Sequence, residues 1–535
     1  MPTGTWAGRV LPPIRWESHF GDRVVRCFSE RPSSIDGMFR EAVARHGCRE
    51  AIVQDSGHLS YAELAAAVDI AASGLESAGI GCGDRVAMLI GNRPEFVVVL
   101  LALQRLRAIA VPISIREQAP GVAYVLGHSG ARLLIHDDDL AGRLPAAGAT
   151  AAAYLGLGSP AWEQLQKVAP RASEENESMS PSGEEDTAVI LYTSGTTGLP
   201  KGAMLSHFNI IHSALHYEFC MDLGYEDRSA VAVPLSHVTG LVGMVMAMLR
   251  VGGALVILGS FKAGAFLQLA SAQRITHTIL VPAMYQLCLL EPDFDRHDLR
   301  AWRIGAYGGA PMPKAAIEAL ARRLPAMTLM NAYGATETTS PSTIMPAGQQ
   351  ADHLTSVGRP VPAADIKVMD DLGREVPRGT SGELWIAGPM VVAGYWDNPQ
   401  ATGIAFTGGY WKSGDIGSVD DDGFVAVFDR RKDMLNRGGY KIYSVEVENV
   451  LLGYAGVVEA AVVGRTCPVL GERVHAVVCV APVLAGDPAE CERLLRAHCL
   501  TALADYKVPE TWVIRTEPLP RNANGKLMKR DLRPV

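Results

Sequence analysis

The segment from residue 191 to residue 207, LYTSGTTGLPKGAMLSH, concentrates side chains that bind phosphate. Its hydroxyl groups offer hydrogen-bond donors, its glycines let backbone N–H groups approach an anion, and its lysine supplies a positive charge on a flexible stem. These features predict a phosphate-binding loop. Its candidate ligands are Thr193, Ser194, Gly195, Thr196, Thr197 and Lys201.

A segment of this composition has two other possible interpretations. A Walker A loop is excluded, because that motif requires Gly-Lys followed by Ser or Thr, whereas Lys201 follows Pro200 and precedes Gly202. A polar surface turn is the remaining alternative, because Ser, Thr and Gly also gather in turns. The rest of the chain has to decide between a turn and a phosphate site.

The composition indicates a folded protein with more than one domain. Of its 535 residues, 48% are hydrophobic and 20% are charged, and the chain is too long for one ordinary core. Its net charge of −8 comes without any Lys/Arg block. A nucleic-acid partner is therefore not expected, because the phosphate backbone selects basic surfaces.

Cysteine usage and hydropathy indicate the compartment. The nine cysteines are scattered without a C-x-x-C pair, which favours neither a disulfide framework nor a zinc knuckle and predicts a reducing, cytoplasmic location. The N-terminus lacks the apolar core of a signal peptide. The longest apolar run, residues 238–249, is too short to span a membrane and predicts a buried helix.

Strand and helix patterns alternate on both sides of the predicted loop. Apolar residues recur at three- and four-residue steps over 61–79, where Ser60 and Glu63 form a capping box, and they predict a helix. Segments 84–90 and 108–113 are predicted strands joined by a second helix. This spacing predicts parallel βαβ units with helices on both faces of a sheet.

The later sequence extends the same pattern and then changes. Strand candidates follow at 254–258, 278–281, 303–307 and 328–331, and the loops after such strands commonly carry the chemistry of α/β sheets. Beyond residue 346 the sequence becomes β-rich and punctuated by glycine, with strand candidates at 365–369 and 382–387.

We therefore predict an α/β fold. It consists of a large N-terminal domain of doubly wound sheets with a β-rich subdomain, followed by a small mobile α+β C-terminal domain. The predicted bounds are 1–428 and 434–535, with a hinge at 429–433, where charge and glycine cluster.

Further motifs follow the loop in order. They are PLSHVTG at 234–240, GGAP at 308–311, NAYGATET at 331–338, GEL at 382–384, GY at 394–395, WKSGD at 411–415, the charged segment 429–439 and PRNANGK at 520–526. Together with the loop they resemble the adenylate-forming superfamily, which includes acyl-CoA synthetases, nonribosomal peptide adenylation domains and luciferases. The agreement of so many motifs outweighs the surface-turn alternative.

The resemblance implies a two-step reaction. A carboxylate attacks the α-phosphate of ATP, giving an acyl-adenylate and pyrophosphate, and a thiol then displaces AMP. It assigns Lys526 to the bridge between carboxylate and α-phosphate, Glu337 to Mg²⁺, and the loop at 193–201 to the β- and γ-phosphates. Lys432 occupies the family's hinge position, about which the C-terminal domain would turn between the two steps.

The other matched positions imply contacts with nucleotide and acid. Tyr333 would stack on adenine, and Asp415 would accept hydrogen bonds from both ribose hydroxyls. His237 belongs to the acyl-pocket motif. The remaining nucleotide contacts would come from the backbone of Gly308, Gly309 and Ala310, from Asn331, Gly334 and Thr336, and from the donor side chain of Arg430.

Two positions depart from the family pattern. Ser413 stands where the family more often has Thr, and Asn436 stands where some relatives carry Lys, so Asn436 receives no role in the thioester step. The pocket motif also lacks an acidic residue placed to hold an α-ammonium group. An amino-acid substrate is therefore disfavoured, because a buried unpaired ammonium is costly.

The sequence allows more than one interpretation for an apolar cluster and for a pair of histidines. An apolar pocket or plain core would each account for Met244, Val245, Met246, Met248 and Val281. His212 and His216 lie four residues apart but lack an H-E-x-x-H frame, and we interpret them as surface or packing residues rather than metal ligands.

We therefore predict an acid–CoA ligase that uses ATP, Mg²⁺ and coenzyme A and activates an apolar acid, either aryl or medium-chain acyl. A homodimer stays open, and no membrane span is expected. One alternative is a ligase that loads a separate carrier protein, although no carrier domain follows residue 530. The other is a catalytically silent nucleotide-binding regulator, against which the intact loop, Glu337, Asp415 and Lys526 argue.

Overall fold

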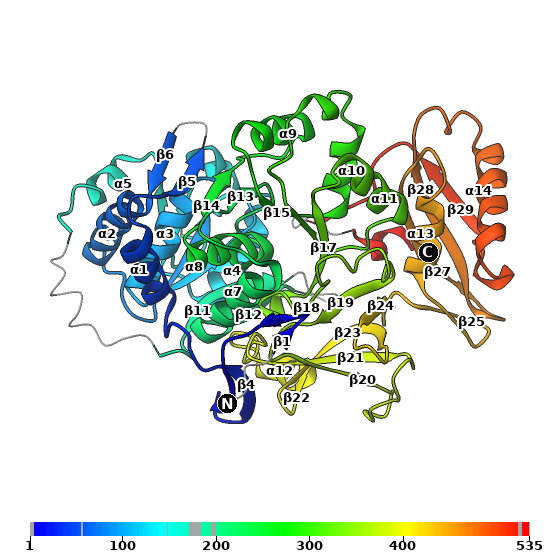
Figure 1. Ribbon diagram of the computed structural model, residues 1–535, viewed down its shortest axis with the longest axis horizontal. Helices are drawn as coiled ribbons and strands as arrows, with labels where there is room; N and C mark the ends of the chain where they lie inside the picture. Colours follow the sequence, from blue (N-terminus) through cyan, green and yellow to red (C-terminus); the bar gives the residue numbers. More distant parts are fainter. Residues whose placement is uncertain are drawn as a thin grey trace. The chain divides into compact units, whose positions relative to one another are not determined.

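The structure, a computed structural model, describes residues 5–54, 57–146, 148–170, 183–193, 199–522 and 527–533 (Figure 1). The chain forms two compact units, each assembled from several segments. Unit 1 comprises 1–311, 319–366 and 386–412, and unit 2 comprises 312–318, 367–385 and 413–535. The domain boundaries given above remain predictions.

The first sheet of unit 1 has six strands in the order β10-β9-β7-β8-β11-β12. Its parallel part confirms the βαβ unit predicted around residues 84–113, with α3 (Pro94–Arg105) joining β7 to β8. At its edge, β12 pairs antiparallel with β11. The strands are β7 (Arg85–Leu89), β8 (Ile109–Pro112), β9 (Leu133–His136), β10 (Ala153–Gly156), β11 (Thr187–Thr193) and β12 (Lys201–Ser206).

The second sheet of unit 1 contains the strands predicted after residue 250. Its order is β19-β18-β17-β16-β15-β13-β14-β5-β6, and the strands from β17 to β5 are parallel. The strands are β5 (Glu50–Gln54), β6 (Gly57–Ser60), β13 (Arg228–Val231), β14 (Ala254–Ile257), β15 (His277–Leu280), β16 (Ile304–Tyr307), β17 (Thr328–Tyr333), β18 (Thr343–Ile344) and β19 (Ser356–Pro360).

A layer of helices contacts both sheets of unit 1. It contains α1 (Ile35–His46), α2 (Tyr61–Ser77), α3, α7 (His207–Met221) and α8 (Ala247–Val251). As predicted, α2 begins at a capping box, in which the Ser60 hydroxyl accepts from the Glu63 N–H and the Glu63 carboxylate accepts from the Ser60 N–H. This pairing satisfies backbone donors that the first turn of a helix otherwise leaves free.

The apolar run at 238–249 forms the buried helix that was predicted. Residues Thr239–Met246 have π-helical hydrogen bonding and lead directly into α8. Met244, Val245, Met246 and Met248 are fully buried, which agrees with the core alternative, whereas Val281 is 41% exposed.

The two histidines of α7 are packing residues and not surface residues. His212 and His216 are fully buried, and the His212 ring donates from Nδ1 to the Phe208 carbonyl at 2.9 Å. Burial lowers the pKa of His216 to about 3 and that of His212 well below its usual value. Neutral imidazoles therefore fill the interior of this helix layer.

Smaller elements complete unit 1. They are β1 (Thr5–Trp6), β2 (Arg9–Val10), β3 (Ile14–His19), β4 (Arg23–Phe28), α4 (Ala119–Ser129), η1 (Asp138–Arg143), α5 (Pro160–Leu165), α9 (Ala263–Ala272), α10 (Pro282–Leu290), η3 (Phe294–Arg296), η4 (Thr336–Thr338), α12 (Pro399–Ala405) and β22 (Phe406–Thr407). Helix α11 (Lys314–Arg323) is shared between the units, because its residues up to 318 belong to unit 2 and those from 319 belong to unit 1.

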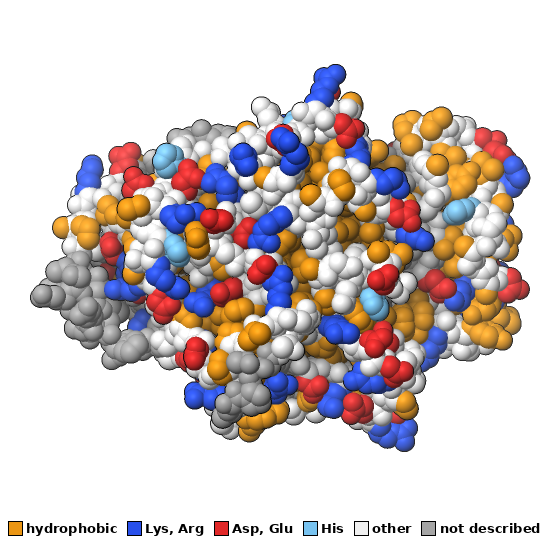
Figure 2. Space-filling view, in the orientation of Figure 1, with side chains coloured by type: hydrophobic (Ala, Val, Ile, Leu, Met, Phe, Trp, Pro, Cys, Tyr) orange, Lys and Arg blue, Asp and Glu red, His pale blue; other side chains and the backbone are white. Residues whose placement is uncertain are grey.

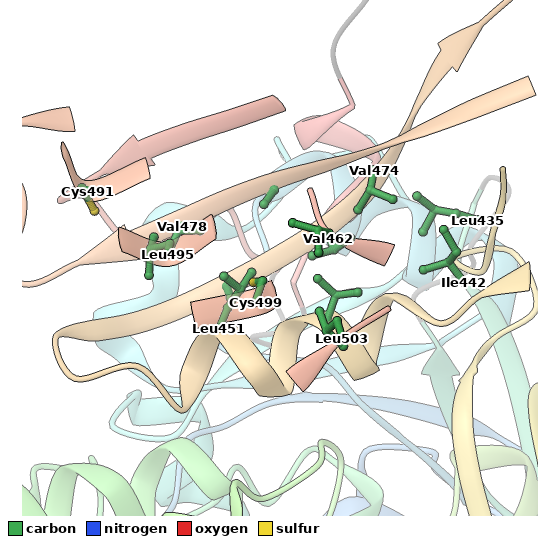
Figure 3. Close-up of a cluster of buried hydrophobic side chains, with 14 of the residues drawn as sticks. Leu435, Ile442, Leu451, Val462, Val474, Val478, Cys491, Leu495, Cys499 and Leu503 are labelled. Carbon is green, nitrogen blue, oxygen red and sulfur yellow. The ribbon is translucent and has the colours of Figure 1, made fainter. Parts of the chain in front are cut away.

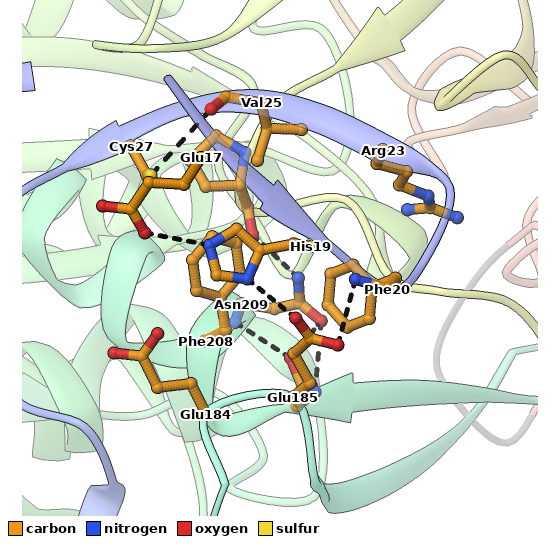
Figure 4. Close-up of polar contacts among 12 residues, drawn as sticks. Glu17, His19, Phe20, Arg23, Val25, Cys27, Glu184, Glu185, Phe208 and Asn209 are labelled. Carbon is orange, nitrogen blue, oxygen red and sulfur yellow. Dashed lines mark hydrogen bonds and ion pairs between the residues drawn. The ribbon is translucent and has the colours of Figure 1, made fainter. Parts of the chain in front are cut away.

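An ion cluster joins the β3–β4 hairpin to the body of unit 1 (Figure 4). Arg31 Nη2 lies 2.7 Å from both Glu17 Oε2 and Glu184 Oε2, and the two ring nitrogens of His19 face Glu17 and Glu185. Ligand atoms of Glu17, His19 and Cys27 lie within 4.8 Å of one another. Arg31 already supplies the cation here, and burial raises the pKa of the Cys27 thiol to about 12, so the cluster is a structural ion network.

The Glu17–Arg31 pair is expected to make stability depend on pH. The Arg31 guanidinium holds the pKa of Glu17 well below its usual range. Because the folded-state pKa is depressed, the stabilisation is present above the ordinary carboxylate pKa and is lost as the pH falls below it. Arg31→Ala should lower the free energy of unfolding by about 2 kcal/mol at pH 7, since it removes the cation that Glu17 and Glu184 share and leaves Glu17 with the contacts to Arg15 and His19.

Urea unfolding of wild type and Arg31→Ala at pH 7 and pH 3.5 measures this effect, and the gap between the two proteins should narrow at the lower pH. Arg40→Ala is the control, because Arg40 forms an exposed pair with Asp36 that contributes about 0.5 kcal/mol or less. Equal unfolding midpoints for the two variants would contradict the proposed role of the pair.

Unit 2 begins with a β-rich part, as the glycine-punctuated sequence predicted. Its strands have the order β20-β21-β23-β24. They are β20 (Asp365–Met369), β21 (Gly382–Ala387), β23 (Tyr410–Val419) and β24 (Val425–Arg430), and the ends of β20, β21 and β23 extend into segments of unit 1.

The last part of the chain is an α+β structure with its own core (Figure 3). A sheet with the order β26-β25-β28-β27, with β29 against β28, carries the helices α13 and α14. Its elements are β25 (Leu435–Arg437), β26 (Tyr440–Ile442), α13 (Ser444–Leu452), β27 (Val457–Cys467), β28 (Gly471–Val480), α14 (Pro488–Ala502), η5 (Asp505–Lys507), β29 (Thr511–Arg515) and η6 (Lys529–Leu532). Side chains such as Leu451, Val462, Val478 and Leu495 fill the space between sheet and helices.

Two surface properties bear on function. Every helix among the described residues is too short or too polar to traverse a lipid bilayer. On the face shown in Figure 2, the described Lys and Arg side chains alternate with Asp and Glu and do not form one basic patch.

Candidate functional site

The predicted site residues fall into two groups, one in each unit. Unit 2 holds Asp415, Arg430 and Lys432. Ser194, Gly195, Thr196, Thr197 and Lys526 lie outside the described residues. Unit 1 holds Thr193, Lys201, His237, Gly308, Gly309, Ala310, Asn331, Tyr333, Gly334, Thr336 and Glu337.

The predicted phosphate loop joins the two strands of the β11–β12 hairpin. Thr193 and Lys201 are cross-strand partners at its end, and the Thr193 hydroxyl donates to the Lys201 carbonyl at 3.4 Å. The Tyr124 hydroxyl donates to the carbonyl of Pro200 at 2.9 Å. The ends of the loop are therefore fixed by the sheet and by α4.

The second sheet brings other predicted residues to one edge. The segments that contain His237 and Gly308 follow β13 and β16, and Tyr333 is the last residue of β17. These three are parallel strands of that sheet. The carboxyl ends of parallel strands meet at the same edge, where α/β proteins bind ligands. His237 itself is exposed.

Asn92 fixes the segment that precedes His237. Its side-chain amide donates to the carbonyls of Val233 at 3.0 Å and Leu258 at 3.3 Å, and its carbonyl oxygen accepts from the N–H of Leu235 at 2.9 Å. Sequence reasoning missed Asn92, because one asparagine in a loop gives no signal of three distant backbone partners.

The glycine loop after β16 lies directly beside the end of β17. Tyr307 and Asn331 are register partners, so Gly308 comes next to Ala332. A Cβ atom at Gly308 would lie 2.3 Å from the Ala332 carbonyl oxygen, so only glycine fits this position. The φ of Gly309 is +78°, which also favours glycine. The side-chain-free backbone of Gly308 and Gly309 and the half-buried ring of Tyr333 therefore lie at the ends of two neighbouring strands.

The central contact of unit 1 joins Lys201, Tyr395 and Glu337. The Tyr395 hydroxyl donates to Glu337 Oε1 at 2.9 Å, and Lys201 Nζ lies 5.0 Å from the centroid of the Tyr395 ring. Burial, together with the neighbouring Glu337 charge, raises the pKa of Tyr395 well above its usual value, so the hydroxyl keeps its proton and remains a donor. The predicted phosphate lysine and the predicted metal carboxylate thus share one tyrosine.

The Gly394-Tyr395 motif is visible in the sequence, but the sequence alone gave Tyr395 no role. The motif was the one sequence feature that could have drawn attention to Tyr395. The contacts of Tyr395 could not be predicted, because they depend on backbone pairing between distant segments. The N–H of Met204 donates to the Gly394 carbonyl at 3.1 Å, and the N–H of Trp396 donates to the Gly202 carbonyl at 2.7 Å. Residues 394–396 therefore run beside β12.

In unit 2, Asp415 and Arg430 form an ion pair across neighbouring strands. They are register partners on β23 and β24, and Arg430 Nε lies 2.6 Å from Asp415 Oδ1. Asp415 is only 3% exposed. The pair orients the carboxylate, and the Arg430 guanidinium remains 36% exposed beside it.

Ser413 performs a structural task next to this pair. Its hydroxyl donates to the Leu384 carbonyl at 2.7 Å and accepts from the N–H of Asp415 at 2.9 Å. A serine hydroxyl meets both requirements, which explains how the departure from the family's threonine is accommodated.

Lys432 lies in the turn after β24; the residue is exposed, but neighbouring groups partly shield its ammonium group from water. Its carbonyl accepts from Arg533 Nη2 at 3.1 Å, and the N–H of Arg431 donates to the Gly414 carbonyl at 2.8 Å. Partial burial of the ammonium group, opposed by Asp433 and assisted by Arg430, lowers the pKa of Lys432. The predicted hinge is a short turn, in which the N–H groups of Asp433 and Met434 both donate to the Arg430 carbonyl.

The segment that carries Lys526 begins and ends at paired residues of unit 2. Arg521 and Leu527 form an antiparallel bridge, and the N–H of Met528 donates to the Pro520 carbonyl at 2.8 Å. Lys529, two residues after Leu527, is held by two contacts: its Nζ lies 2.7 Å from Glu448 Oε1 and 2.6 Å from the Ser444 hydroxyl. Both flanks of the predicted catalytic lysine are therefore held in place.

The donor set of unit 1 fits a magnesium–nucleotide complex. Mg²⁺ prefers one or two carboxylate oxygens and completes its shell with phosphates and water. Tyr395 occupies Oε1 of the half-exposed Glu337, and no described residue hydrogen-bonds Oε2. The ammonium group of Lys201, which lies over the ring of the same tyrosine, supplies a positive charge for the phosphates.

Comparison with known proteins agrees with this arrangement. Residues 39–396 match the family of AMP-binding enzymes, and residues 446–526 match the AMP-binding enzyme C-terminal domain. Feruloyl-CoA synthase from Amycolatopsis sp is 36% identical over 475 residues, which cover 89% of this chain and 93% of that protein. Long-chain-fatty-acid–CoA ligase FadD13 from Mycobacterium tuberculosis is 32% identical over 508 residues, which cover 94% and 98%.

The fold has solved counterparts. The structure of o-succinylbenzoate coenzyme A synthetase (MenE) from Bacillus subtilis, in complex with ATP and magnesium ion, superposes with a TM-score of 0.80 at 27% identity, covering 92% of this chain and 98% of that one. The predicted superfamily and the α/β fold with a large N-terminal and a small C-terminal domain are confirmed. The chain belongs to the family of AMP-binding enzymes and, within it, to the AMP-forming acyl-CoA synthetases and ligases.

Proposed function

We propose that this enzyme activates an apolar aryl or medium-chain carboxylic acid with ATP and Mg²⁺ and transfers the acyl group to coenzyme A. The observation that carries the proposal is the contact between Lys201, Tyr395 and Glu337, which joins a cation and a carboxylate at the hairpin that bears the phosphate loop. Such a pair suits a phosphate chain that carries its own metal ion.

In the first step the carboxylate oxygen bonds to the α-phosphorus of ATP, and pyrophosphate leaves. Two anions must approach each other, so the site has to supply positive charge where negative charge develops. We assign this task to Lys526, while Lys201 and the hydroxyls from Thr193 to Thr197 hold the departing β- and γ-phosphates. The paired residues around 520–528 support a fixed approach of that lysine.

Glu337 would hold Mg²⁺, which supplies charge neutralisation to the phosphates. The chain's own contribution is the orientation of this carboxylate, because Tyr395 donates to one of its oxygens. The neighbouring backbone also constrains it, since the N–H of Val392 donates to the Glu337 carbonyl at 3.0 Å.

The nucleoside contacts are assigned to the strand ends and to the Asp415–Arg430 pair. We propose that adenine lies between Tyr333 and the glycine loop at 308–310, with Asn331, Gly334 and Thr336 alongside. Asp415 would accept from both ribose hydroxyls, and the Arg430 pair that orients its carboxylate supports this role.

In the second step a thiolate sulfur bonds to the acyl carbon, and AMP leaves as the C–O bond breaks. We propose that backbone rotation at Lys432 turns the C-terminal domain between the two steps. The exposed position of Lys432, in the turn directly after β24, supports this assignment. All nine cysteines are free thiols, which supports work in a reducing cytoplasm.

The substrate class rests on chemistry near His237. The motif that contains it offers no carboxylate for an α-ammonium group, and Val281 is an apolar side chain that remains 41% exposed after β15. The relatives named above are called feruloyl-CoA and long-chain-fatty-acid ligases. An aryl or alkyl acid is therefore the proposed substrate.

A panel of acids read by pyrophosphate release tests this proposal. We expect cinnamate-type and medium-chain acids to stimulate release at least about tenfold over amino acids of similar size, because an unpaired buried ammonium costs more than 1.4 kcal/mol. Preference for amino acids would contradict the substrate class. Products that form only on a carrier protein would favour the carrier-loading alternative.

A further inference from the structure

Tyr395 touches two proposed ligand groups from one buried position. Its side chain is 6% exposed, its hydroxyl donates to Glu337, and its ring faces the ammonium group of Lys201. Glu337 and Tyr395 are 58 residues apart in the chain. A buried tyrosine needs an acceptor for its hydroxyl, but a backbone carbonyl would have sufficed, as it does for Tyr61.

Independent contacts fix the position of Tyr395. Its N–H donates to the Thr402 hydroxyl at 3.0 Å, and the Thr402 hydroxyl donates to the Asn398 carbonyl at 2.9 Å. The Phe406 ring packs edge-on at 5.7 Å between centroids. With the backbone pairing of 394–396 to β12, these contacts leave the tyrosine ring little freedom.

We propose that Tyr395 is a positioning residue that couples metal binding to phosphate binding, an inference that rests on the proposed function. Its hydroxyl holds Glu337 with one oxygen toward the tyrosine, leaving the other for Mg²⁺. Its ring holds Lys201 by a cation–π contact beside the phosphates. Groups that orient a metal ligand in this way commonly contribute a factor of 10 to 100 in metal affinity.

The two functions of the side chain are separable by substitution. Tyr395→Phe keeps the ring beside Lys201 and removes the hydroxyl, with its hydrogen bonds to Glu337 and to the Trp411 side chain. Tyr395→Leu removes both contacts. The first variant should therefore affect the metal-dependent part of nucleotide binding alone, and the second should also affect the metal-independent part.

Calorimetric titration of the full-length protein with ATP, in the presence and absence of Mg²⁺, measures both parts without turnover. In wild type, Mg²⁺ should tighten ATP binding. Tyr395→Phe should reduce this enhancement about tenfold and leave ATP affinity without Mg²⁺ unchanged. Tyr395→Leu should in addition weaken ATP binding without Mg²⁺ about threefold, the loss of an exposed cation–π contact.

Tyr61→Phe is the matched control. Tyr61 is another buried tyrosine of unit 1, and its hydroxyl donates to the Gly253 carbonyl at 2.7 Å. This variant should lower the melting temperature and leave the effect of Mg²⁺ on ATP affinity unchanged. In Glu337→Gln the further change Tyr395→Phe should add less than twofold, because the hydroxyl acts through that carboxylate.

Thr402→Val provides a second route if Tyr395→Phe does not fold. It frees the backbone of Tyr395 and should reduce the Mg²⁺ enhancement in the same direction. The inference about Tyr395 would be overturned if Mg²⁺ tightened ATP binding to folded Tyr395→Phe as much as in wild type, or if this variant lost ATP affinity equally with and without Mg²⁺. Either result would leave the proposed function standing. A wild type whose ATP binding does not respond to Mg²⁺ would instead overturn the proposed metal site and this inference with it.

Discussion

Lys526→Ala is expected to reduce acyl-adenylate formation by at least about 100-fold, which corresponds to roughly 3 kcal/mol of lost charge stabilisation. ATP affinity should change less than about threefold, because the ammonium group acts on charge that develops only as the carboxylate meets the α-phosphate. Acid-dependent pyrophosphate exchange measures the first quantity, and calorimetric titration with ATP measures the second.

Lys367→Ala serves as the control for a lost lysine in unit 2. Lys367 pairs with the exposed carboxylate of Glu375 at 3.0 Å, a surface contact that is weak in water. This variant should exchange pyrophosphate at the wild-type rate. If Lys526→Ala loses ATP affinity and adenylation to the same extent, Lys526 binds ground-state nucleotide and the assigned role is wrong.

Lys432→Pro is expected to separate the two half-reactions. Proline fixes φ near −65°, so the turn after β24 can no longer rotate about that bond. Adenylation should stay within about threefold of wild type, while acyl-CoA formation falls about 100-fold, the cost of misplaced reacting groups. Single-turnover assays of acyl-adenylate formation, and of its consumption by coenzyme A, measure the two steps separately.

Lys432→Ala is the matched variant, because it removes the ammonium group and keeps the backbone free to rotate. It should retain most of the thioester-forming activity. Unchanged overall turnover in Lys432→Pro would show that the hinge lies elsewhere. Equal defects in Lys432→Ala and Lys432→Pro would assign the effect to the side chain.

Local sequence signals predicted the elements of the fold well. Helix α2 has both an apolar repeat and the Ser60–Glu63 capping box, and each signal indicates the same helix start. The strands around residues 84–113 pair as predicted because a helix between two short apolar strands forces a parallel crossover. These features depend on residues that are close together in the chain, so the sequence is sufficient to predict them.

Long-range environments were less accessible. The four-residue spacing of His212 and His216 left a choice between surface and packing, and only the surrounding layer of helices shows that both are buried. The same holds for Met244 to Met248, which are buried because this segment packs against α7 and against β13, β14 and β15 of the second sheet.

The candidate site shows the same division. The loop around Lys201 suggested phosphate binding, and the resemblance assigned Mg²⁺ to Glu337 and placed both residues in one reaction. Their connection through Tyr395 depends on residues 394–396 pairing with β12, and no periodicity marks that pairing. The positions of Asp415 and Arg430 on adjacent strands likewise follow from the register of β23 and β24.

The proposed enzyme forms an acyl-adenylate and passes the acyl group to coenzyme A. Product accounting with purified protein, one acid selected from the panel, ATP, Mg²⁺ and coenzyme A tests both steps together. We expect AMP, pyrophosphate and acyl-CoA in equal amounts, all dependent on the acid. Formation of ADP and phosphate, or AMP release without any acyl thioester, would contradict the proposed function.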